Sequence, residues 1–156
     1  MRLTDILKTE CVKVPLQAAD KQAALYELVD LLGEHAGVVE VDQLKAAVWD
    51  REQARTTGIG HGIGIPHGKT GCLTQLSMAI GIPATPLDFN AIDGKPVELI
   101  ILLASPQDQT GAHIQALAKI SRMLTDDVFR EGVKLAESGE QLFEMLVQQE
   151  AAIAGG

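Results

Sequence analysis

Residues 58–68 read Gly58-Ile59-Gly60-His61-Gly62-Ile63-Gly64-Ile65-Pro66-His67-Gly68. Glycine reaches backbone conformations that other residues avoid and lets other groups come close to the main chain, while proline fixes φ. Because Pro66 directly precedes the imidazole, we expect the side chain of His67 to be presented rather than packed. The isoleucines at 59, 63 and 65 share one face of an extended segment, which predicts that this face lies in the core. The alternative is a glycine-rich turn that carries an incidental histidine.

Length and composition fit one domain. A chain of 156 residues can bury roughly two thirds of the surface that it exposes when unfolded. With 46% hydrophobic and 22% charged residues, the composition is that of a globular protein rather than a disordered or membrane one. A net charge of -8 and few aromatic residues (three Phe, one Tyr, one Trp) disfavour nucleic acid as a partner.

The cysteines and the N-terminal residues indicate where in the cell the protein is expected. Cys11 and Cys72 are too few for a disulfide framework and are expected to be reduced thiols. Asp5 and Glu10 interrupt the region where a signal peptide would be apolar, so no export signal is expected. The charge-free stretch 71–87 contains two prolines and several polar residues, which argues against a spanning helix and membrane insertion. A cytoplasmic location is the expectation.

Helical and strand patterns alternate along the chain. The expected elements are a short helix at 3–8, a strand at 11–14 ended by Pro15, helices starting at Asp20 and Asp42, strands at 75–82 and 97–104, a helix starting at Thr110, and helices at 127–137 and 138–149. The helix starting at Thr110 is expected to bury Ile114, Leu117, Ile120 and Leu124. The second helix is expected to bury Leu44, Ala47, Val48 and Arg51. The strand with the run 99–103 is apolar throughout, which predicts a central strand covered on both faces. Residues 151–156 are expected to form a flexible tail.

The layout lacks the sequence motifs of several common active sites. The spacing of the glycines does not fit G-x-G-x-x-G, and no G-x-S-x-G is present for a serine nucleophile. Gly68-Lys69-Thr70 resembles the end of a P-loop but follows Pro66-His67 instead of the required run. Zinc remains a minor alternative, with His61, His67, Cys72 and His113 as possible ligands. No further cysteine or carboxylate completes a familiar zinc set.

A nucleophilic histidine that handles an anionic group is the remaining interpretation. His113 falls in the first turn of the helix that Thr110 begins, where free backbone N–H groups favour an anion and a neutral imidazole. Arg51 lies on the helix before the glycine segment and can attract a phosphoryl oxygen. Each residue also has a structural interpretation: His113 as a helix cap, and Arg51 as a surface cation paired with Glu52 or Asp50.

Longer motifs resemble one family. They are Arg51-Glu52, Thr57-Gly58-Ile59-Gly60, Ile65-Pro66-His67-Gly68-Lys69, Phe89-Asn90-Ala91-Ile92-Asp93-Gly94-Lys95-Pro96-Val97, Pro106-x-Asp108-Gln109 and His113-x-x-x-Leu117. Together they are similar to the fructose/mannitol-type enzyme IIA domains of the bacterial phosphoenolpyruvate-dependent phosphotransferase system, over essentially the whole chain. The second group of motifs resembles the nitrogen-related, regulatory branch. His61 and Gly64 depart from that branch, which often has Asn and Ala there.

The resemblance implies a fold and a chemistry. The fold is a single α/β (α+β) domain, residues 1–150, with a mixed β-sheet of about four to five strands and helices on both sides. His67 is the implied phosphorylation site, at Nε2, with His113, Arg51 and Thr57 beside it. The implied donor is a histidine phosphocarrier protein, and no cofactor or metal is expected. A small apolar ring near Ile59, Ile63 and Ile65, under about 1,200 Å² in total, is the expected docking face.

Two functions stay open at this stage. In one, regulated proteins such as kinases or ion transporters read the phosphorylation state of His67. In the other, a sugar-specific enzyme IIA passes the phosphoryl group to an enzyme IIB. The 156 residues contain no permease-like or enzyme IIB segment, which favours the regulatory function.

Overall fold

The computed structural model describes residues 1–154 and alternates strands with helices along the chain. In order, the elements are a 3-10 turn η1 (Leu3–Asp5), β1 (Leu7–Leu16), α1 (Lys21–His35), α2 (Val41–Ala54), β2 (Gly58–Gly60), β3 (Ile63–Gly64), β4 (His67–Thr70), β5 (Ser77–Pro83), β6 (Leu99–Pro106), α3 (Thr110–Met123), α4 (Asp127–Val133) and α5 (Gly139–Ala154).

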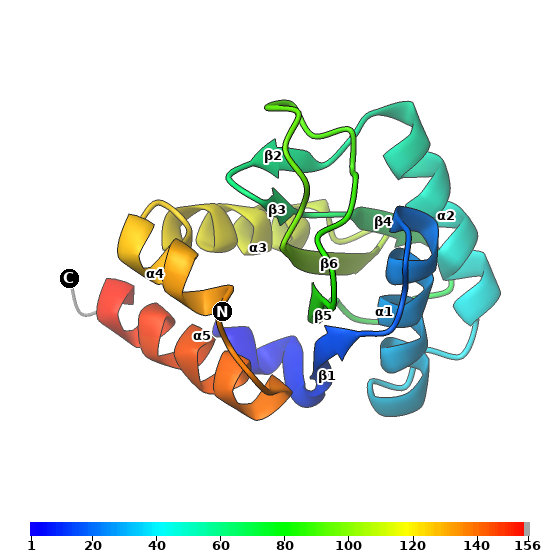
Figure 1. The fold of residues 1–156 in the computed structure, drawn as a ribbon. Coiled ribbons are helices and arrows are strands. Elements are labelled where there is room, and N and C mark those ends of the chain that lie inside the picture. Colours follow the sequence, from blue (N-terminus) through cyan, green and yellow to red (C-terminus); the bar gives the residue numbers. More distant parts are fainter. Residues whose placement is uncertain (155–156) are drawn as a thin grey trace.

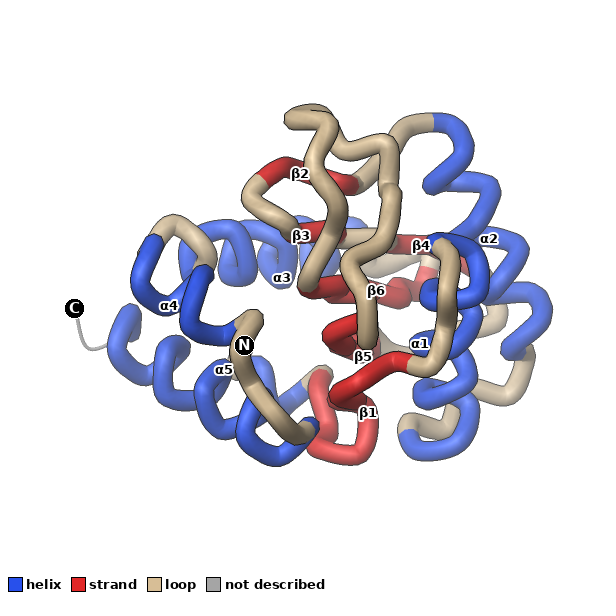
Figure 2. Tube along the Cα trace, viewed as in Figure 1, coloured by secondary structure: helices blue, strands red, loops and turns tan. Residues whose placement is uncertain are grey.

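One mixed sheet forms the centre of the fold (Figure 2). Its path runs β1-β5-β6-β3-β2, and β4 pairs with β6 beside that path. The β1–β5, β3–β6 and β4–β6 pairs are parallel, while β5–β6 and β2–β3 are antiparallel. The sheet has six strands rather than the expected four to five, because the glycine segment supplies three short strands instead of a loop.

Strand β6 is the core of the sheet, as its apolar sequence predicts. All eight of its residues are buried, and β5 pairs along one edge while β3 and then β4 pair along the other. A strand covered on both faces needs apolar side chains at every position, which explains the run Leu99-Ile100-Ile101-Leu102-Leu103.

Helices cover both sides of the sheet, which confirms the expected architecture. Figure 1 shows α1 and α2 on one side, with α3, α4 and α5 on the other. Helix α1 begins where its sequence predicts, because the Asp20 carboxylate accepts the N–H of Ala23 at 2.8 Å and caps the first turn. Helix α2 packs against β4, the strand that starts at His67.

Three expected boundaries at the start of the chain are wrong. The opening helix is only a 3-10 turn, and β1 begins at Leu7 and continues through Pro15 to Leu16. Proline is tolerated there because β1 is an edge strand, where a missing N–H can face away from its neighbour. Helix α2 begins one residue before Asp42, since the N–H of Leu44 bonds the carbonyl of Glu40 at 3.1 Å.

The second half of the chain contains further differences. The buried stripe of α3 is His113, Ala116, Ile120 and Met123, whereas Ile114 is 59% exposed. Helix α4 is shorter than expected and ends at Val133. Helix α5 continues to Ala154, so residues 151–154 are helical rather than a separate tail, and residues 155–156 lie outside the described part. Among residues 1–154, no helix is long and apolar enough to cross a membrane.

Candidate active site

The glycine segment forms β2, a tight turn, β3 and the start of β4. Gly60, His61 and Gly62 all have positive φ (96°, 59° and 77°), which lets the chain reverse between β2 and β3. Ile59 is 45% exposed, while Ile63 and Ile65 are buried at 1% and 6%. The expectation that the three isoleucines form one buried face is therefore wrong for Ile59. It also follows that Ile63 and Ile65 cannot form a docking face.

Strand β4 holds His67 against the central strand. His67 is in register with Leu103 of β6, and the N–H of Leu103 bonds the carbonyl of Pro66 at 3.0 Å. On the other side, Gly68 faces α2 so closely that an added Cβ would lie 2.8 Å from Cγ2 and 3.1 Å from the backbone N of Val48. The glycine after His67 thus allows α2 to approach the strand that carries the imidazole.

The structure brings His67 and His113 together. Their ring centroids lie 5.2 Å apart with an interplanar angle of 70°, an edge-to-face arrangement. His67 starts β4, whereas His113 lies in the first turns of α3. His113 is 4% exposed, and His67 is half-buried. This proximity agrees with the predicted pairing of the two histidines at one site.

Hydrogen bonding fixes which nitrogen of His67 is free. Its Nδ1 lies 3.1 Å from the carbonyl oxygen of Ile65. A carbonyl oxygen only accepts, so Nδ1 carries the proton and donates. In the neutral ring the lone pair is then on Nε2, which has no hydrogen-bond partner among the described residues. Nε2 is therefore the ring nitrogen of His67 that keeps a free lone pair.

Sequence reasoning missed Ser105, which holds the second histidine. Its Oγ lies 2.5 Å from Nδ1 of His113, and Ser105 is fully buried at the end of β6. A hydroxyl can donate or accept, so this bond orients the ring in either tautomer. The signal in the sequence was the single hydroxyl directly after the apolar run 99–104, at the carboxyl end of the central strand, where sites often lie.

Both imidazoles have a pKa below the ordinary value. Burial lowers the pKa of His67; the Ile65 carbonyl and Glu52 oppose this shift, while Arg51 and Lys69 add to it. Burial lowers the pKa of His113 to about 4, with smaller contributions from His67 and Lys69. The expected direction for His113 is confirmed, but the main cause is burial rather than the helix dipole. Both rings are therefore neutral at pH 7.

Arg51 supplies positive charge beside this pair. It lies in the last turn of α2, its Nη1 donates to the carbonyl of Arg55 at 3.0 Å, and its charge reaches His67. Within residues 1–154 it forms no ion pair with Asp50 or Glu52, the partners that a purely structural arginine was expected to have. Its guanidinium keeps donors free for an anion.

Thr57 is buried and faces Glu52, which the sequence suggested only as a surface partner of Arg51 but which is itself buried. The backbone N–H and the hydroxyl of Thr57 both donate to the Glu52 carboxylate, at 2.8 and 2.5 Å, and Lys21 pairs with the same carboxylate at 2.7 Å. The signal was the helical spacing of Leu44, Val48 and Glu52, which lie on one face of α2. Glu52 occupies the inner position that had been assigned to Arg51.

The four side chains considered for zinc are not gathered into one site. No group of three or more His, Cys, Asp or Glu side chains in residues 1–154 is arranged to hold a metal ion. His61 lies exposed in the turn after β2, where its N–H bonds Asp93 at 3.1 Å. Cys72 instead contacts the hydroxyl of Thr70 at 3.2 Å. The zinc alternative therefore lacks its ligand set.

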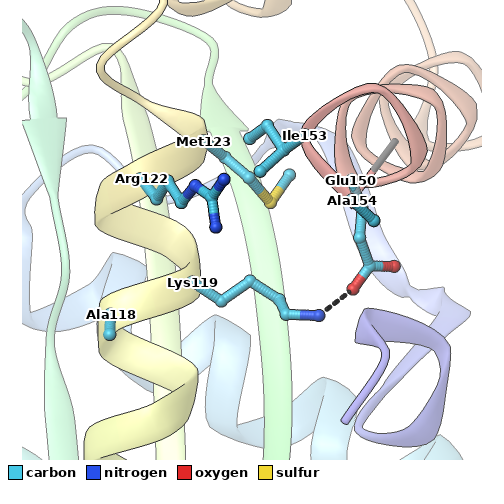
Figure 3. Close-up of a pocket in the computed structure, with 7 residues that line it drawn as sticks. All are labelled: Ala118, Lys119, Arg122, Met123, Glu150, Ile153 and Ala154. Atoms are coloured by element: carbon cyan, nitrogen blue, oxygen red, sulfur yellow. Dashed lines mark hydrogen bonds and ion pairs between the residues drawn. The ribbon is translucent and has the colours of Figure 1, made fainter. Parts of the chain in front are cut away.

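A separate hollow of about 240 Å³ lies between α3 and α5 (Figure 3). Met123 and Ile153 form its apolar part, and Lys119 reaches across to pair with Glu150 at 2.6 Å. None of His67, His113, Arg51 and Thr57 lines it. The histidine pair thus lies outside this hollow.

Comparison with known proteins assigns the chain to a protein family. The family model described as "Phosphoenolpyruvate-dependent sugar phosphotransferase system, EIIA 2" matches residues 5–149. The chain is 32% identical to the nitrogen regulatory protein of Klebsiella oxytoca, over 95% of this chain and 91% of that protein. It is also 32% identical to the PTS system fructose-specific EIIA component of Haloferax volcanii, over 94% and 95% of the two chains.

A longer relative and two solved structures extend the comparison. The fructose-specific EIIABC component of Bacillus subtilis is 27% identical over 96% of this chain, which spans only 24% of that protein. The crystal structure of IIA-Ntr from Neisseria meningitidis has a TM-score of 0.83 and 29% identity, covering 91% of this chain and 97% of that one. The Escherichia coli mannitol IIA, solved with phosphorylated IIB, has a TM-score of 0.77 over 92% of this chain and 99% of that one. The two sequences are 22% identical, so this likeness is one of fold only. The chain belongs to the EIIA 2 family of the phosphoenolpyruvate-dependent sugar phosphotransferase system.

Proposed function

We propose that this protein accepts a phosphoryl group on Nε2 of His67 from a phosphohistidine of a small phosphocarrier protein. The bond from Nδ1 of His67 to the carbonyl of Ile65 carries the proposal, because it leaves the Nε2 lone pair free on a ring that is neutral at pH 7. Family membership supports the same chemistry, since EIIA proteins are components of a phosphoryl-transfer system.

The proposed step balances without another reactant. The N–P bond of the donor phosphohistidine breaks, its electron pair returns to the donor imidazole, and the Nε2 lone pair of His67 forms the new N–P bond. The proton on Nδ1 stays in place, and the Ile65 carbonyl stabilises the positive charge that develops on the ring. Catalysis then consists of positioning and charge stabilisation, as for phosphoryl transfer in general.

Arg51, His113 and Thr57 have different roles in this proposal. Arg51 stabilises the charge on the transferring oxygens. His113, held through Nδ1 by Ser105, presents Nε2 to the group on His67. Thr57 does not contact the phosphoryl group but anchors the start of the glycine segment through Glu52. We assign His67, His113 and Arg51 to the site itself and Thr57 to its support.

Phosphorylation of purified variants tests the proposal. The protein is incubated with phosphoenolpyruvate, enzyme I and a phosphocarrier protein, and the acid-labile adduct of one phosphoryl group is mapped by mass spectrometry. Wild type and His61→Ala, the matched histidine of the same glycine segment, are expected to be labelled stoichiometrically. His67→Ala is expected to remain unlabelled. Full labelling of His67→Ala would refute the assignment.

We further propose that the phosphorylation state of His67 is read by regulated proteins such as kinases or ion transporters. Relatives named nitrogen regulatory protein support this function. A phosphoryl group adds about -1.5 to -2 charges to a protein whose net charge is already -8. A partner that docks around unmodified His67 would then lose affinity through repulsion and desolvation.

The competing function is that of a sugar-specific enzyme IIA that phosphorylates an enzyme IIB. Relatives named fructose-specific support it. Pull-downs with wild type and with His67→Glu, which carries part of the charge, separate the two functions. Different partner sets for the two baits are expected for regulation. Recovery of one enzyme IIB by both baits, with loss of growth on a single sugar after gene deletion, would favour sugar uptake instead.

A further inference from the structure

Glu52 is a buried carboxylate at the back of the histidine site. It is 3% exposed and accepts three bonds, from Nζ of Lys21 (2.7 Å) and from the N–H and hydroxyl of Thr57 (2.8 and 2.5 Å). Lys21 in turn donates to the carbonyl of Phe89 at 2.9 Å, and Thr56 donates to the same carbonyl at 2.6 Å. One carboxylate thus links the start of α1, the end of α2 and the start of the glycine segment, and through Lys21 it is connected to the segment at Phe89.

Stability alone is a weak reason for such a group. Removing a carboxylate and an ammonium from water is costly, and well-packed apolar residues often stabilise a fold as well as a buried ion pair does. Buried ion pairs are better suited to fixing one geometry. The geometry fixed here is that of α2, because Glu52 and Val48 lie one turn apart on its inner face.

This inner face is directly coupled to the reacting imidazole. Val48 packs on Gly68, the residue after His67, and Arg51 directly precedes Glu52 in α2. Successive residues of a helix are about 100° apart, so anchoring Glu52 inward sets the direction in which Arg51 leaves the helix. Rotation of α2 would move the guanidinium away from His67.

We propose that Glu52 is a positioning residue for phosphoryl transfer, which holds α2 and the glycine segment so that Arg51 stands beside His67 and which supplies negative charge behind the imidazole. This inference rests on the proposed phosphorylation of His67. The charged and titratable groups around that ring are Arg51 and Glu52 from α2, Lys69 from β4 and His113 from α3. Glu52 is the anion in this set. Its charge raises the pKa of His67, whereas the charges of Arg51 and Lys69 lower it.

The substitution Glu52→Gln tests the role with little change in shape. The amide can still accept one bond from Thr57, but the charge that faces Lys21 and His67 is lost. We expect single-turnover transfer from the phosphorylated phosphocarrier to slow by about tenfold or more, as for loss of a bond to a charged group. The apparent KM for the phosphocarrier should stay unchanged, and the pKa of His67, followed by NMR, should fall. Asp50→Asn, an exposed acid-to-amide change on the same helix, should leave the transfer rate and the pKa of His67 at wild-type values.

A double variant separates positioning from simple structural support. Glu52→Gln leaves the Lys21 ammonium buried without its carboxylate, and Lys21→Met in addition removes that ammonium. If Glu52 only stabilised the fold, Lys21→Met/Glu52→Gln would recover both thermal stability and transfer. We expect it to recover stability while transfer stays slow and the pKa of His67 stays low. Recovery of wild-type transfer by the double variant, or unchanged transfer in Glu52→Gln, would overturn the inference.

The two proposals fail in different ways. If wild-type protein is not phosphorylated at His67, the proposed function is wrong. If wild type is phosphorylated and Glu52→Gln matches it in rate and in the pKa of His67, only the role of Glu52 is wrong. The NMR titration needs no phosphoryl donor, so it tests the charge of Glu52 at His67 independently of transfer.

Discussion

His67 and His113 differ in the partner of the same ring atom. Nδ1 of His67 faces a carbonyl that can only accept, which fixes the proton on Nδ1 and leaves a free lone pair on Nε2. Nδ1 of His113 faces the hydroxyl of Ser105, which can donate or accept. In the proposed transfer, the first ring attacks, and the second donates from Nε2 when Ser105 donates to its Nδ1. At the scale of single residues, backbone and hydroxyl partners decide the two roles.

The pKa of His113 is the first residue-scale prediction. Because burial lowers it to about 4, the ring should stay neutral from pH 8 down to about pH 5. NMR titration of the His113 imidazole resonances should show no protonation step near 6.5. A titration of His113 above pH 6.5 would contradict the neutral role.

The same shift predicts how stability depends on pH. The folded-state pKa of His113 lies below the free value of 6.5, so between about 4 and 6.5 the unfolded chain binds more protons at this position. The corresponding contribution to stability is fully present above pH 6.5 and is lost as the pH falls toward 4. Urea unfolding at about pH 7.5 and about pH 5 should therefore show a larger loss for wild type than for His113→Gln. Equal losses would argue against a buried neutral imidazole.

Ser105 gives a second residue-scale prediction. Ser105→Ala leaves Nδ1 of His113 buried without its partner, which should lower the free energy of unfolding by about 1–3 kcal/mol. Phosphoryl transfer should slow by about 2–10-fold, because the ring loses its orientation. Ser77→Ala is the matched control, since Ser77 is also buried but on β5 and does not contact His113. Equal effects of the two substitutions on transfer would remove Ser105 from the site.

At the scale of elements, local signals predicted what local chemistry determines. The Asp20 cap fixed the start of α1, and the apolar run of β6 predicted a central strand, because capping and two-sided burial act on neighbouring residues. The pairing of His67 with His113 and the nearby Arg51 followed from the motifs of the resemblance. The three side chains were therefore expected to be neighbours, but strand β4, which carries His67, was not predicted.

Tertiary contacts account for the parts that the sequence did not reveal. Helix α3 buries His113 rather than Ile114, because the helix is rotated to place the imidazole on Ser105. Glu52 is a polar residue at an inner position, and only its partners Lys21 and Thr57 make that burial favourable. Helical spacing puts Glu52 in line with Leu44 and Val48, but it does not identify the partners that make a buried polar side chain favourable there.

The contact of α2 with β4 gives an element-scale prediction. Gly68→Ala would place a Cβ 2.8 Å from Cγ2 of Val48 and 3.1 Å from its backbone N, so α2 must move away from β4. We expect a loss of about 1–3 kcal/mol in stability and slower transfer, because Arg51 moves with the helix. Gly132→Ala in α4, where an added Cβ meets nothing within 4 Å, should be neutral or stabilising. Unfolding midpoints and single-turnover rates of the two variants check this, and wild-type transfer in Gly68→Ala would show that the helix position does not matter.

At the scale of the whole molecule, charge and exposed apolar groups bear on docking. The protein has a net charge of -8, so a neutral or acidic partner needs apolar contacts to approach His67. With Ile63 and Ile65 buried, we expect the docking face to use the exposed isoleucines instead: Ile59 of β2 (45%), Ile92 (76%) and Ile114 of α3 (59%), the residue after His113. Ile92 is held beside β2 by the bond from its N–H to the carbonyl of Gly58 at 3.1 Å.

Ile114→Glu and Ile92→Glu test this docking face. Each change should raise the apparent KM for the phosphorylated phosphocarrier, by about 10-fold or more if one buried isoleucine contributes about 1.5–3 kcal/mol. The maximal single-turnover rate should be unchanged, because neither side chain touches the reacting atoms.

Leu135→Glu is the matched control: Leu135 is 77% exposed and follows α4, which packs on α5. Added negative charge alone would affect all three variants alike and would weaken with salt, whereas loss of an apolar contact affects only the two isoleucines and persists at high ionic strength. A similar rise in KM for Leu135→Glu would therefore place the docking face elsewhere or reduce it to charge.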